Sequence, residues 1–247
     1  MKKITLIISI LAVSVSLLFT SCNAFAKEIK GNGKLVTTSI PISKFSKIKI
    51  ETFVVVDYSQ DQNEETLDFM VDENLFEYYD IYTKGDALYI KLKKGNCKNC
   101  PRPTTILVTV SSEKLRSIEI AGRSKFNFIT AFHSDELNIS LAGSGKITAN
   151  KYPVNIEECK IEIAGSGGVQ FAGAVNYAVV EIAGSGNVMA LDCQISTLQV
   201  EIAGSGCVEA NVTDKLKASI AGSGNVKFTG DPDIKTDIAG SGKVVKL

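Results

Sequence analysis

The stretch that decides the fold is Ile163-Ala164-Gly165-Ser166-Gly167-Gly168-Val169, because its tetrapeptide recurs through the C-terminal half of the chain. Ala-Gly-Ser-Gly begins at Ala142, Ala164, Ala183, Ala203, Ala221 and Ala239, and a degenerate copy, Ala-Gly-Arg-Ser, begins at Ala121. The successive spacings are 21, 22, 19, 20, 18 and 18 residues. A repeat of about 20 residues is typical of a solenoid, in which each unit buries its apolar face only against its neighbours.

The flanks of the tetrapeptide alternate with the period of a β-strand. Triplets such as Ile161-Glu162-Ile163 precede it, and the fifth residue after its first Ala is apolar in every copy: Ile147, Val169, Val188, Val208, Val226 and Val244. Period-two alternation places the β-branched residues on one face and the polar residues on the other. The sequence therefore predicts an all-β fold with a right-handed parallel β-helix over residues 112–247. A left-handed helix is disfavoured because the coils contain no six-residue apolar pattern.

The tetrapeptide itself predicts a sharp corner between two strands. Glycine allows positive φ, and Ala fits a corner that is too tight for a larger side chain. The Ser side chains are expected to stack in a column, each hydrogen-bonding its neighbour or the adjacent backbone. The glycines assigned to these turns are Gly143, Gly145, Gly165, Gly167, Gly184, Gly186, Gly204, Gly206, Gly222, Gly224, Gly240 and Gly242.

The same alternation predicts an outward column of polar side chains, namely Glu119, Ser140, Glu162, Glu181, Glu201, Ser219 and Asp237. Neighbouring glutamates at one strand spacing repel each other. A second column two residues earlier contains Lys160, Lys217 and Lys235, which can offset this repulsion. A solvated face balanced by lysine is preferred over the alternative, a cation site along the ladder.

Residues 41–111 lack the tetrapeptide and are interpreted as a β-rich head that caps the solenoid. Strands are expected over 48–58, 66–71, 78–83, 87–93 and 104–110, with one helical turn at 72–76. Ten acids and no basic residue lie between Lys49 and Lys84. Five tyrosines of the head could stack on sugar rings beside these acids, or could instead fill a Tyr-rich core, which is the commoner use of aromatics: Tyr58, Tyr78, Tyr79, Tyr82 and Tyr89.

The N-terminus predicts export. Lys2 and Lys3 precede an apolar run that is too short for an ordinary membrane span, so residues 1–21 are interpreted as a signal peptide. Phe19-Thr20-Ser21-Cys22 resembles a lipobox, which favours lipidation at Cys22, a linker over 22–40 and an outer-membrane lipoprotein. Neither the periplasmic nor the surface face is favoured. The alternative is cleavage after Ala26, which would release a soluble protein.

Four segments follow one another in a distinctive order: Phe45-Ser46-Lys47-Ile48, then Asp72-Glu73-Asn74-Leu75, then Gly85-Asp86-Ala87-Leu88-Tyr89-Ile90, then repeated Ile-Ala-Gly-Ser-Gly. In this order the chain resembles the head GIN domain family, labelled "putative auto-transporter adhesin" and common among lipoproteins of Bacteroidetes-type bacteria. The resemblance spans from about residue 40 to the C-terminus. It implies a parallel β-helix and an envelope location, and the family offers no catalytic residues to carry over.

The remaining motifs narrow the class of function. The 27 basic and 27 acidic residues form no basic stripe, which argues against a nucleic-acid partner, and no cofactor is expected. Cys97 and Cys100 predict a local disulfide rather than a redox pair or a zinc site. Cys159 is expected in the core, and no pair is assigned among it, Cys193 and Cys207. His133 is the only histidine and no nucleophile elbow precedes it, so no catalytic triad is predicted.

We therefore expect a non-catalytic envelope protein that is held at the membrane by its lipid and binds a glycan or a protein of the envelope or host. Two other classes stay open. A structural component would self-assemble through the uncapped C-terminal end of the solenoid, so a homo-oligomer is one expectation. Only Lys243 and Lys246 are charged residues there that would oppose pairing of the edge strand with another chain. A polysaccharide lyase or hydrolase would need clustered acids in a groove along the coils.

Overall fold

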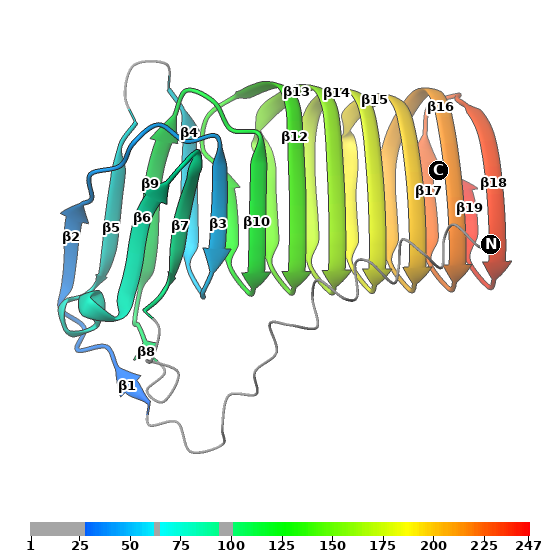
Figure 1. Ribbon diagram of the computed structural model, residues 1–247. Helices are drawn as coiled ribbons and strands as arrows, with labels where there is room; N and C mark the ends of the chain where they lie inside the picture. The colour runs from blue at the N-terminus through cyan, green and yellow to red at the C-terminus, as the bar shows by residue number, and fades with distance from the viewer. Residues whose placement is uncertain (1–27, 62–64, 94–100) are drawn as a thin grey trace.

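The protein is an elongated stack of β-strands, and the computed structural model describes residues 28–61, 65–93 and 101–247 (Figure 1). Seventeen of the described strands form one continuous sheet that winds around the core, with near strands and far strands on opposite sides of it (Figure 1). The C-terminal part is built from these strands: β10 (Ser117–Gly122), β11 (Lys125–Phe128), β12 (Phe132–Gly143), β13 (Lys146–Gly165), β14 (Gly168–Gly184), β15 (Asn187–Gly204), β16 (Cys207–Gly222), β17 (Asn225–Thr229), β18 (Asp233–Gly240) and β19 (Lys243–Lys246).

All pairings among these ten strands are parallel and in register with the tetrapeptide. The register joins the first Ala of every copy in one column, which runs through Ala121, Ala142, Ala164, Ala183, Ala203, Ala221 and Ala239. In Figure 1 the near strands run downward, the far strands run upward, and successive coils are displaced to the right. The coil is therefore right-handed, and the β-solenoid expected from the repeat is confirmed.

The corners are held together by backbone hydrogen bonds between coils. The Ser166 amide donates to the Gly143 carbonyl oxygen at 2.8 Å, and the Gly168 amide donates to Gly145 at 2.9 Å. The six Ser side chains of the tetrapeptides are exposed, and none has a side-chain hydrogen bond among the described residues. The expected column of hydrogen-bonded Ser hydroxyls is therefore wrong. The backbone closes the corner, and the Ser side chains, which follow the ends of β12, β13, β14, β15, β16 and β18, project into solvent.

The two glycines of each corner are needed for different reasons. The first glycine has positive φ, as at Gly184 (φ 123°), and a Cβ there would lie 2.6 Å from the Gly165 carbonyl oxygen. The second glycine lies inside the coil, and a Cβ at Gly186 would meet Ile163 Cγ2 at 2.5 Å. Positive φ was expected of both glycines, but only the first adopts it. The second is required because the coils stack so closely.

The strands of the head continue the sheet of the solenoid. β3 (Lys47–Glu51) and β4 (Val55–Gln60) pair in parallel with β10 and β11, and β7 (Ala87–Leu92) and β9 (Ile106–Ser112) pair in parallel on the far side of β3 and β4. The chain therefore passes from β9 across an earlier coil before it resumes at β10. Because of this crossing, neighbours in the stack are not neighbours in sequence.

The strand expected over 48–58 is wrong, because a corner at residues 52–54 divides it into β3 and β4. The buried Ser124 makes this corner. Its hydroxyl accepts a hydrogen bond from the Val54 amide at 3.1 Å and donates to the Thr52 carbonyl oxygen. Ser124 occupies the place of the second glycine in the degenerate tetrapeptide, so an inward hydroxyl replaces a glycine where the solenoid meets the head.

Antiparallel strands close the N-terminal end of the stack. β5 (Leu67–Asp72) pairs antiparallel with β9 and with β2 (Leu35–Ser39), and β6 (Tyr79–Lys84) pairs antiparallel with β7. The helical turn expected from the sequence is present as the 3₁₀ helix η1 (Glu73–Tyr78), which covers the same end of the stack. The short strands β1 (Ile29–Lys30) and β8 (Pro101–Arg102) pair with each other beside it. One continuous hydrophobic cluster runs from Phe45 in the head to Phe228.

A buried carboxylate ties the incoming chain to this cap. Asp72 accepts hydrogen bonds from the Gly33 amide at 2.7 Å, the Thr104 amide at 2.8 Å and the Thr104 hydroxyl at 2.5 Å. Burial by itself would raise the pKa of Asp72, but these hydrogen bonds outweigh it and hold the pKa below its usual value. Asn74 adds contacts to Asn32 and Lys30. The first described residues are thus fixed against the head.

Replacing Gly186 by Ala should lower the free energy of unfolding by about 2 kcal/mol, because the added methyl group overlaps Ile163 in the preceding coil. Ser185→Ala, one residue away on the exposed side of the same corner, should be nearly neutral. Urea denaturation of both variants measures the difference. Equal stabilities would contradict the close stacking of the coils.

Candidate functional site

The most regular surface feature is one row of outward side chains across the near sheet of Figure 1, which we call the ladder face. Strand register places one residue of each coil in this row, from the head to the C-terminal end: Tyr82, Tyr89, Lys49, Glu119, Ser140, Glu162, Glu181, Glu201, Ser219 and Asp237. The outward column predicted from the repeat is therefore confirmed, and the head extends it by two tyrosines and a lysine.

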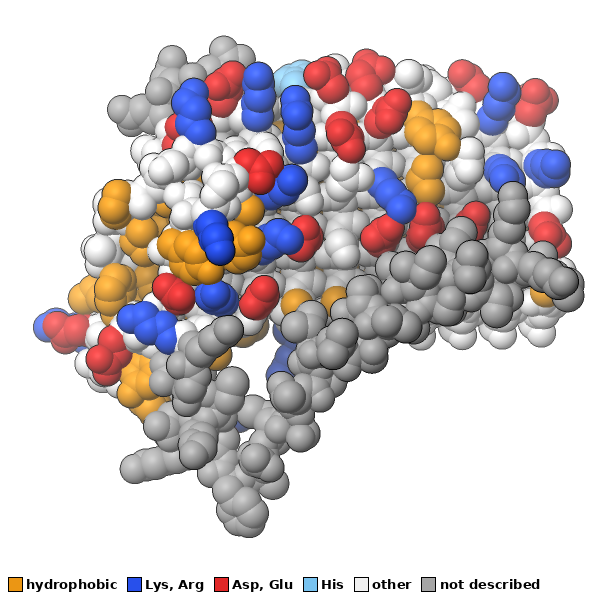
Figure 2. Space-filling view, in the orientation of Figure 1, with side chains coloured by type: hydrophobic (Ala, Val, Ile, Leu, Met, Phe, Trp, Pro, Cys, Tyr) orange, Lys and Arg blue, Asp and Glu red, His pale blue; other side chains and the backbone are white. Residues whose placement is uncertain are grey.

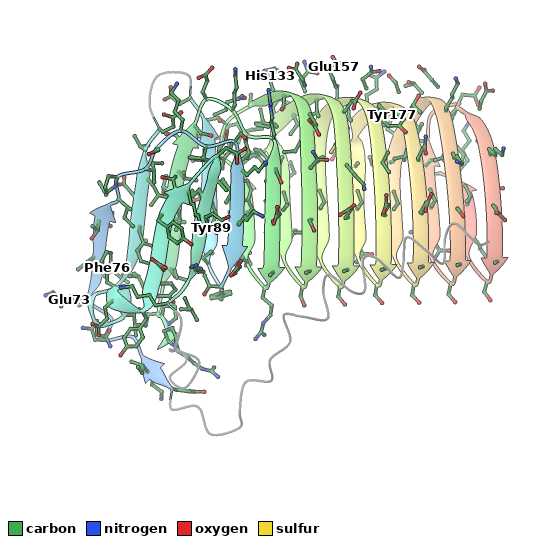
Figure 3. The ribbon with its side chains drawn as sticks, viewed as in Figure 1. Glu73, Phe76, Tyr89, His133, Glu157 and Tyr177 are labelled. Atoms are coloured by element: carbon green, nitrogen blue, oxygen red, sulfur yellow. The ribbon has the colours of Figure 1, made fainter. Side chains whose placement is uncertain are left out.

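The head end of the ladder face is aromatic. Tyr82 and Tyr89 stack with ring centroids 5.1 Å apart and planes 10° from parallel. The Lys91 ammonium donates to the Tyr82 hydroxyl at 2.9 Å and lies 5.0 Å from the centroid of the same ring. Figure 2 shows hydrophobic and basic side chains gathered on the near face of the head, and Figure 3 labels Tyr89 on that face. Both rings are half-exposed, so the aromatic end is accessible to a ligand.

The other tyrosines of the expected ligand face do not reach this surface. Tyr58 is fully buried, stacks on Phe126 and bonds Ser112, and burial raises its pKa to about 12. Tyr79 is buried against Phe69, and burial likewise raises its pKa to about 12. Tyr78 is half-buried against the hydrophobic core. The ligand face expected from five tyrosines is therefore wrong for Tyr58 and Tyr79, because these two belong to the core.

Lysines offset the carboxylates of the ladder face. Lys160 lies 2.5 Å from Glu162 and 3.4 Å from Glu181, so one ammonium serves two neighbouring coils. The hydrogen bond that the Lys160 ammonium donates to Glu162 raises the pKa of Lys160 above its usual value, against the opposing effect of burial. Lys49 pairs with Glu119 at 2.8 Å, and that hydrogen bond raises the pKa of Lys49 in the same way. These contacts favour the balanced face over a cation site.

Between the two ion pairs the ladder face is hollowed. Small polar side chains line a depression of about 370 Å³ there: Ser117, Asn138 and Ser140. Glu119 borders it on the head side, and Lys160 and Glu162 border it on the other side. The depression thus offers hydroxyl, amide, carboxylate and ammonium groups at fixed positions beside the aromatic end.

A second hollow of about 370 Å³ lies on the upper rim, where the chain crosses from β9 to β10. His133 lines it, and Figure 3 shows His133 and Glu157 on this rim. The Gln60 side chain fixes the hollow by bonding the backbone of both Glu113 and His133. Ser134 is adjacent, but its hydroxyl bonds backbone groups of Leu115 and Glu136. Among the described residues no hydrogen bond joins Ser134 to His133.

The cysteines divide into two groups. Cys97, Cys100 and Cys22 lie outside the described residues. Cys159 is buried, and its register with Ala178 and Leu198 confirms its expected place in the core. Cys159, Cys193 and Cys207 are free thiols, and burial raises the pKa of both Cys159 and Cys193 to about 12. The inner thiols therefore act as packing groups.

Two further features were sought across the part of the chain that the structure describes. It contains no cluster of three or more His, Cys, Asp or Glu side chains arranged to hold a metal ion. No helix within it has the length and apolar character required to span a membrane.

Replacing Lys160 by Met should lower the free energy of unfolding by about 1 kcal/mol at pH 7, because Glu162 and Glu181 then face each other without a counter-charge. The folded-state pKa of Lys160 is raised, so its contribution is complete below 10.5 and fades as the pH rises through the folded value. Thermal unfolding between pH 7 and 12 measures this difference.

The control is Lys151→Met, which removes an ammonium that lies over the Tyr152 ring and has no carboxylate partner in the described structure. This variant should be close to the parent protein at every pH. A Lys160→Met deficit that persists unchanged above pH 12 would contradict the electrostatic explanation.

Solved structures share this fold. An adhesin-like protein of Bacteroides fragilis, described as a "putative adhesin", superposes with a TM-score of 0.82 at 22% identity, over 89% of this chain and 100% of that one. A "putative lipid binding protein" of Parabacteroides distasonis gives 0.76 at 30% identity, over 90% and 100%. A "putative adhesin" of Parabacteroides merdae gives 0.68 at 26% identity, over 90% and 100%. No curated protein matches the chain.

The family described as "Putative auto-transporter adhesin, head GIN domain" matches residues 44–232. This span begins just before β3 and covers both the head and nearly all of the solenoid. The resemblance noted in the sequence is therefore confirmed, and the chain belongs to the head GIN domain family of auto-transporter-adhesin type.

Proposed function

We propose that this protein is a non-catalytic adhesion module of the cell envelope that binds an extended glycan along its ladder face. The observation that carries the proposal is the continuous row from the Tyr82–Tyr89 stack through Lys49 and Glu119 to the depression at Ser140. Family membership supports an adhesive role, and the face supports the ligand class.

A glycan suits the chemistry of this face. Sugar rings present apolar C–H faces that pack on aromatic rings, and their hydroxyls both donate and accept hydrogen bonds. Tyr89 offers the aromatic group, Ser117 offers a hydroxyl two strands away, and Asn138 and Ser140 offer small polar partners three strands away. Every one of these side chains stands on a strand of the stack, so the groups are pre-organised and little entropy is lost on binding.

A lipid ligand would need an apolar cavity. The cavity inside the solenoid beside Cys159 and Cys193 measures only about 10 Å³, which is at the lower limit of the space that one water molecule needs and far too small for a lipid chain. The interior of the coils at this level is filled by side chains. A polar ligand on the outer face is therefore favoured over a lipid chain in the core.

We place the protein, as part of this proposal, at the outer membrane, where a lipid on Cys22 would anchor it. The described chain begins at Glu28, which pairs with Arg102 at 2.7 Å, and residues 30–34 are bonded to Asp72 and Asn74. A segment of six residues spans at most about 20 Å, so an anchor at Cys22 would hold the capped end of the stack near the membrane. The ladder face would then extend away from it.

Tyr89→Ala should reduce glycan binding about tenfold, because the variant loses one aromatic platform worth about 1–2 kcal/mol. The matched control is Tyr152→Ala, which removes another half-exposed tyrosine with a lysine over its ring, away from the ladder face. A glycan array identifies the ligand, and calorimetry compares the variants. Absence of binding to any envelope glycan, or equal losses in both variants, would refute the glycan proposal.

Cys22→Ser should prevent lipidation and move the protein from the membrane fraction to the soluble fraction. Metabolic labelling with a radioactive fatty acid measures the modification directly. Ala26→Arg, which blocks the alternative cleavage site instead, should leave the label in place. Unlabelled parent protein that begins at Lys27 would show that the alternative processing is used.

A further inference from the structure

At the end of the stack opposite the head, the last strands that the structure describes each have an edge that no other described strand pairs with. β18 pairs only with β16 and β19 only with β17 among the described strands, so each has one free edge (Figure 1). Such an edge presents backbone donors and acceptors that another strand can pair with. The head end differs, because antiparallel strands and η1 cover it.

Inward side chains are exposed at this open end. Ile234 and Ile238 occupy the register positions of Leu216 and Ile220 in the coil before. The earlier pair is 1% exposed, whereas Ile234 is 50% and Ile238 is 40% exposed. The core column therefore continues into the last coil and is left half-covered there. Covering these two side chains would bury apolar surface that every preceding coil already buries.

The sequence of β18 is complementary to itself. Antiparallel pairing of two copies about Thr236 places Ile234 opposite Ile238 of the second copy, and places Lys235 opposite Asp237 of the second copy. The inner face then matches isoleucine with isoleucine, and the outer face matches lysine with aspartate. Opposite charges that face each other across antiparallel strands are stabilising.

Other registers lack this match. Centring the pair on Lys235 sets that lysine against its own copy and Asp233 against Asp237. Centring it on Asp237 sets two aspartates against each other. A shift by one residue turns the isoleucines of one copy to the outer face. The register centred on Thr236 is therefore favoured by both packing and charge.

From these features we propose that the free edge of β18 is an interface with a second copy of the chain, in an antiparallel pair centred on Thr236. The two stacks then join end to end across a two-fold axis, with Ile234 and Ile238 of both copies in one buried row. The interface lies on the edge of the last coil, so this proposal is independent of ligand binding on the ladder face.

Thr236→Cys in the full-length chain tests the register directly. The two introduced thiols lie across the axis at a Cα separation of about 4.5–5.5 Å, which suits a disulfide. Mild oxidation of membranes that contain the variant should yield a cross-linked dimer on a non-reducing gel. The control is Met189→Cys, which is likewise at an exposed position (Met189 is 50% exposed) but lies on the side of the stack. Cross-linking of Thr236→Cys no faster than of Met189→Cys would overturn the proposal.

Exchanging the charges of Lys235 and Asp237 tests whether the partner of β18 is a second copy of the same strand. In the Thr236→Cys background, Lys235→Asp and Asp237→Lys should each lower cross-linking about tenfold, because each creates two like-charge contacts per dimer. The double variant Lys235→Asp/Asp237→Lys restores opposite charges across the axis and should return to within about twofold of the background. A double variant no better than the single variants would show that the edge pairs in another way or with another protein, and would refute this interface.

Discussion

The structure depends on the close approach of backbone to backbone at the corners of the coils. The Gly165 carbonyl oxygen would lie 2.6 Å from a Cβ at Gly184, and Ile163 Cγ2 would lie 2.5 Å from a Cβ at Gly186, and both distances are too short for non-bonded atoms. Only hydrogen atoms fit in these spaces, so the corner can repeat at one strand spacing without distortion. Each corner amide then finds a carbonyl in the coil before it. The tetrapeptide therefore fixes the register of every strand.

Because the register is fixed, corresponding residues of successive coils stack in columns. Inside, isoleucine and valine superpose and form a continuous core, which is the favourable consequence. Outside, carboxylates superpose as well, which is unfavourable without counter-charges. Lys160 offsets the repulsion between Glu162 and Glu181 by forming an ion pair with each of them. The fixed register also spaces the outward side chains of the ladder face at regular intervals, which suits an extended polymer. The same register therefore shapes both the core and the proposed binding surface.

The two ends of the stack are treated differently. At the head, β2, β5 and β6 reverse direction and η1 lies over the end, while Asp72 binds the incoming chain with charge-assisted hydrogen bonds. At the other end, β18 keeps the parallel direction and its isoleucines are half-exposed. The capped end suits attachment and the free edge suits contact with another strand. The two ends of the stack are therefore expected to make different contacts.

The sequence by itself determined the solenoid, the ladder of outward residues and the place of Cys159, because a repeat of stacked coils makes each position's environment readable from its period. It could not separate the buried Tyr58 and Tyr79 from the half-exposed Tyr82 and Tyr89, since the head has no repeat and its strands pair across the crossing from β9 to β10. It also missed the corner at residues 52–54, because Ser124, distant in sequence, makes it. Local pattern decides contacts between successive coils, whereas contacts between distant segments are decided only when the chain is folded.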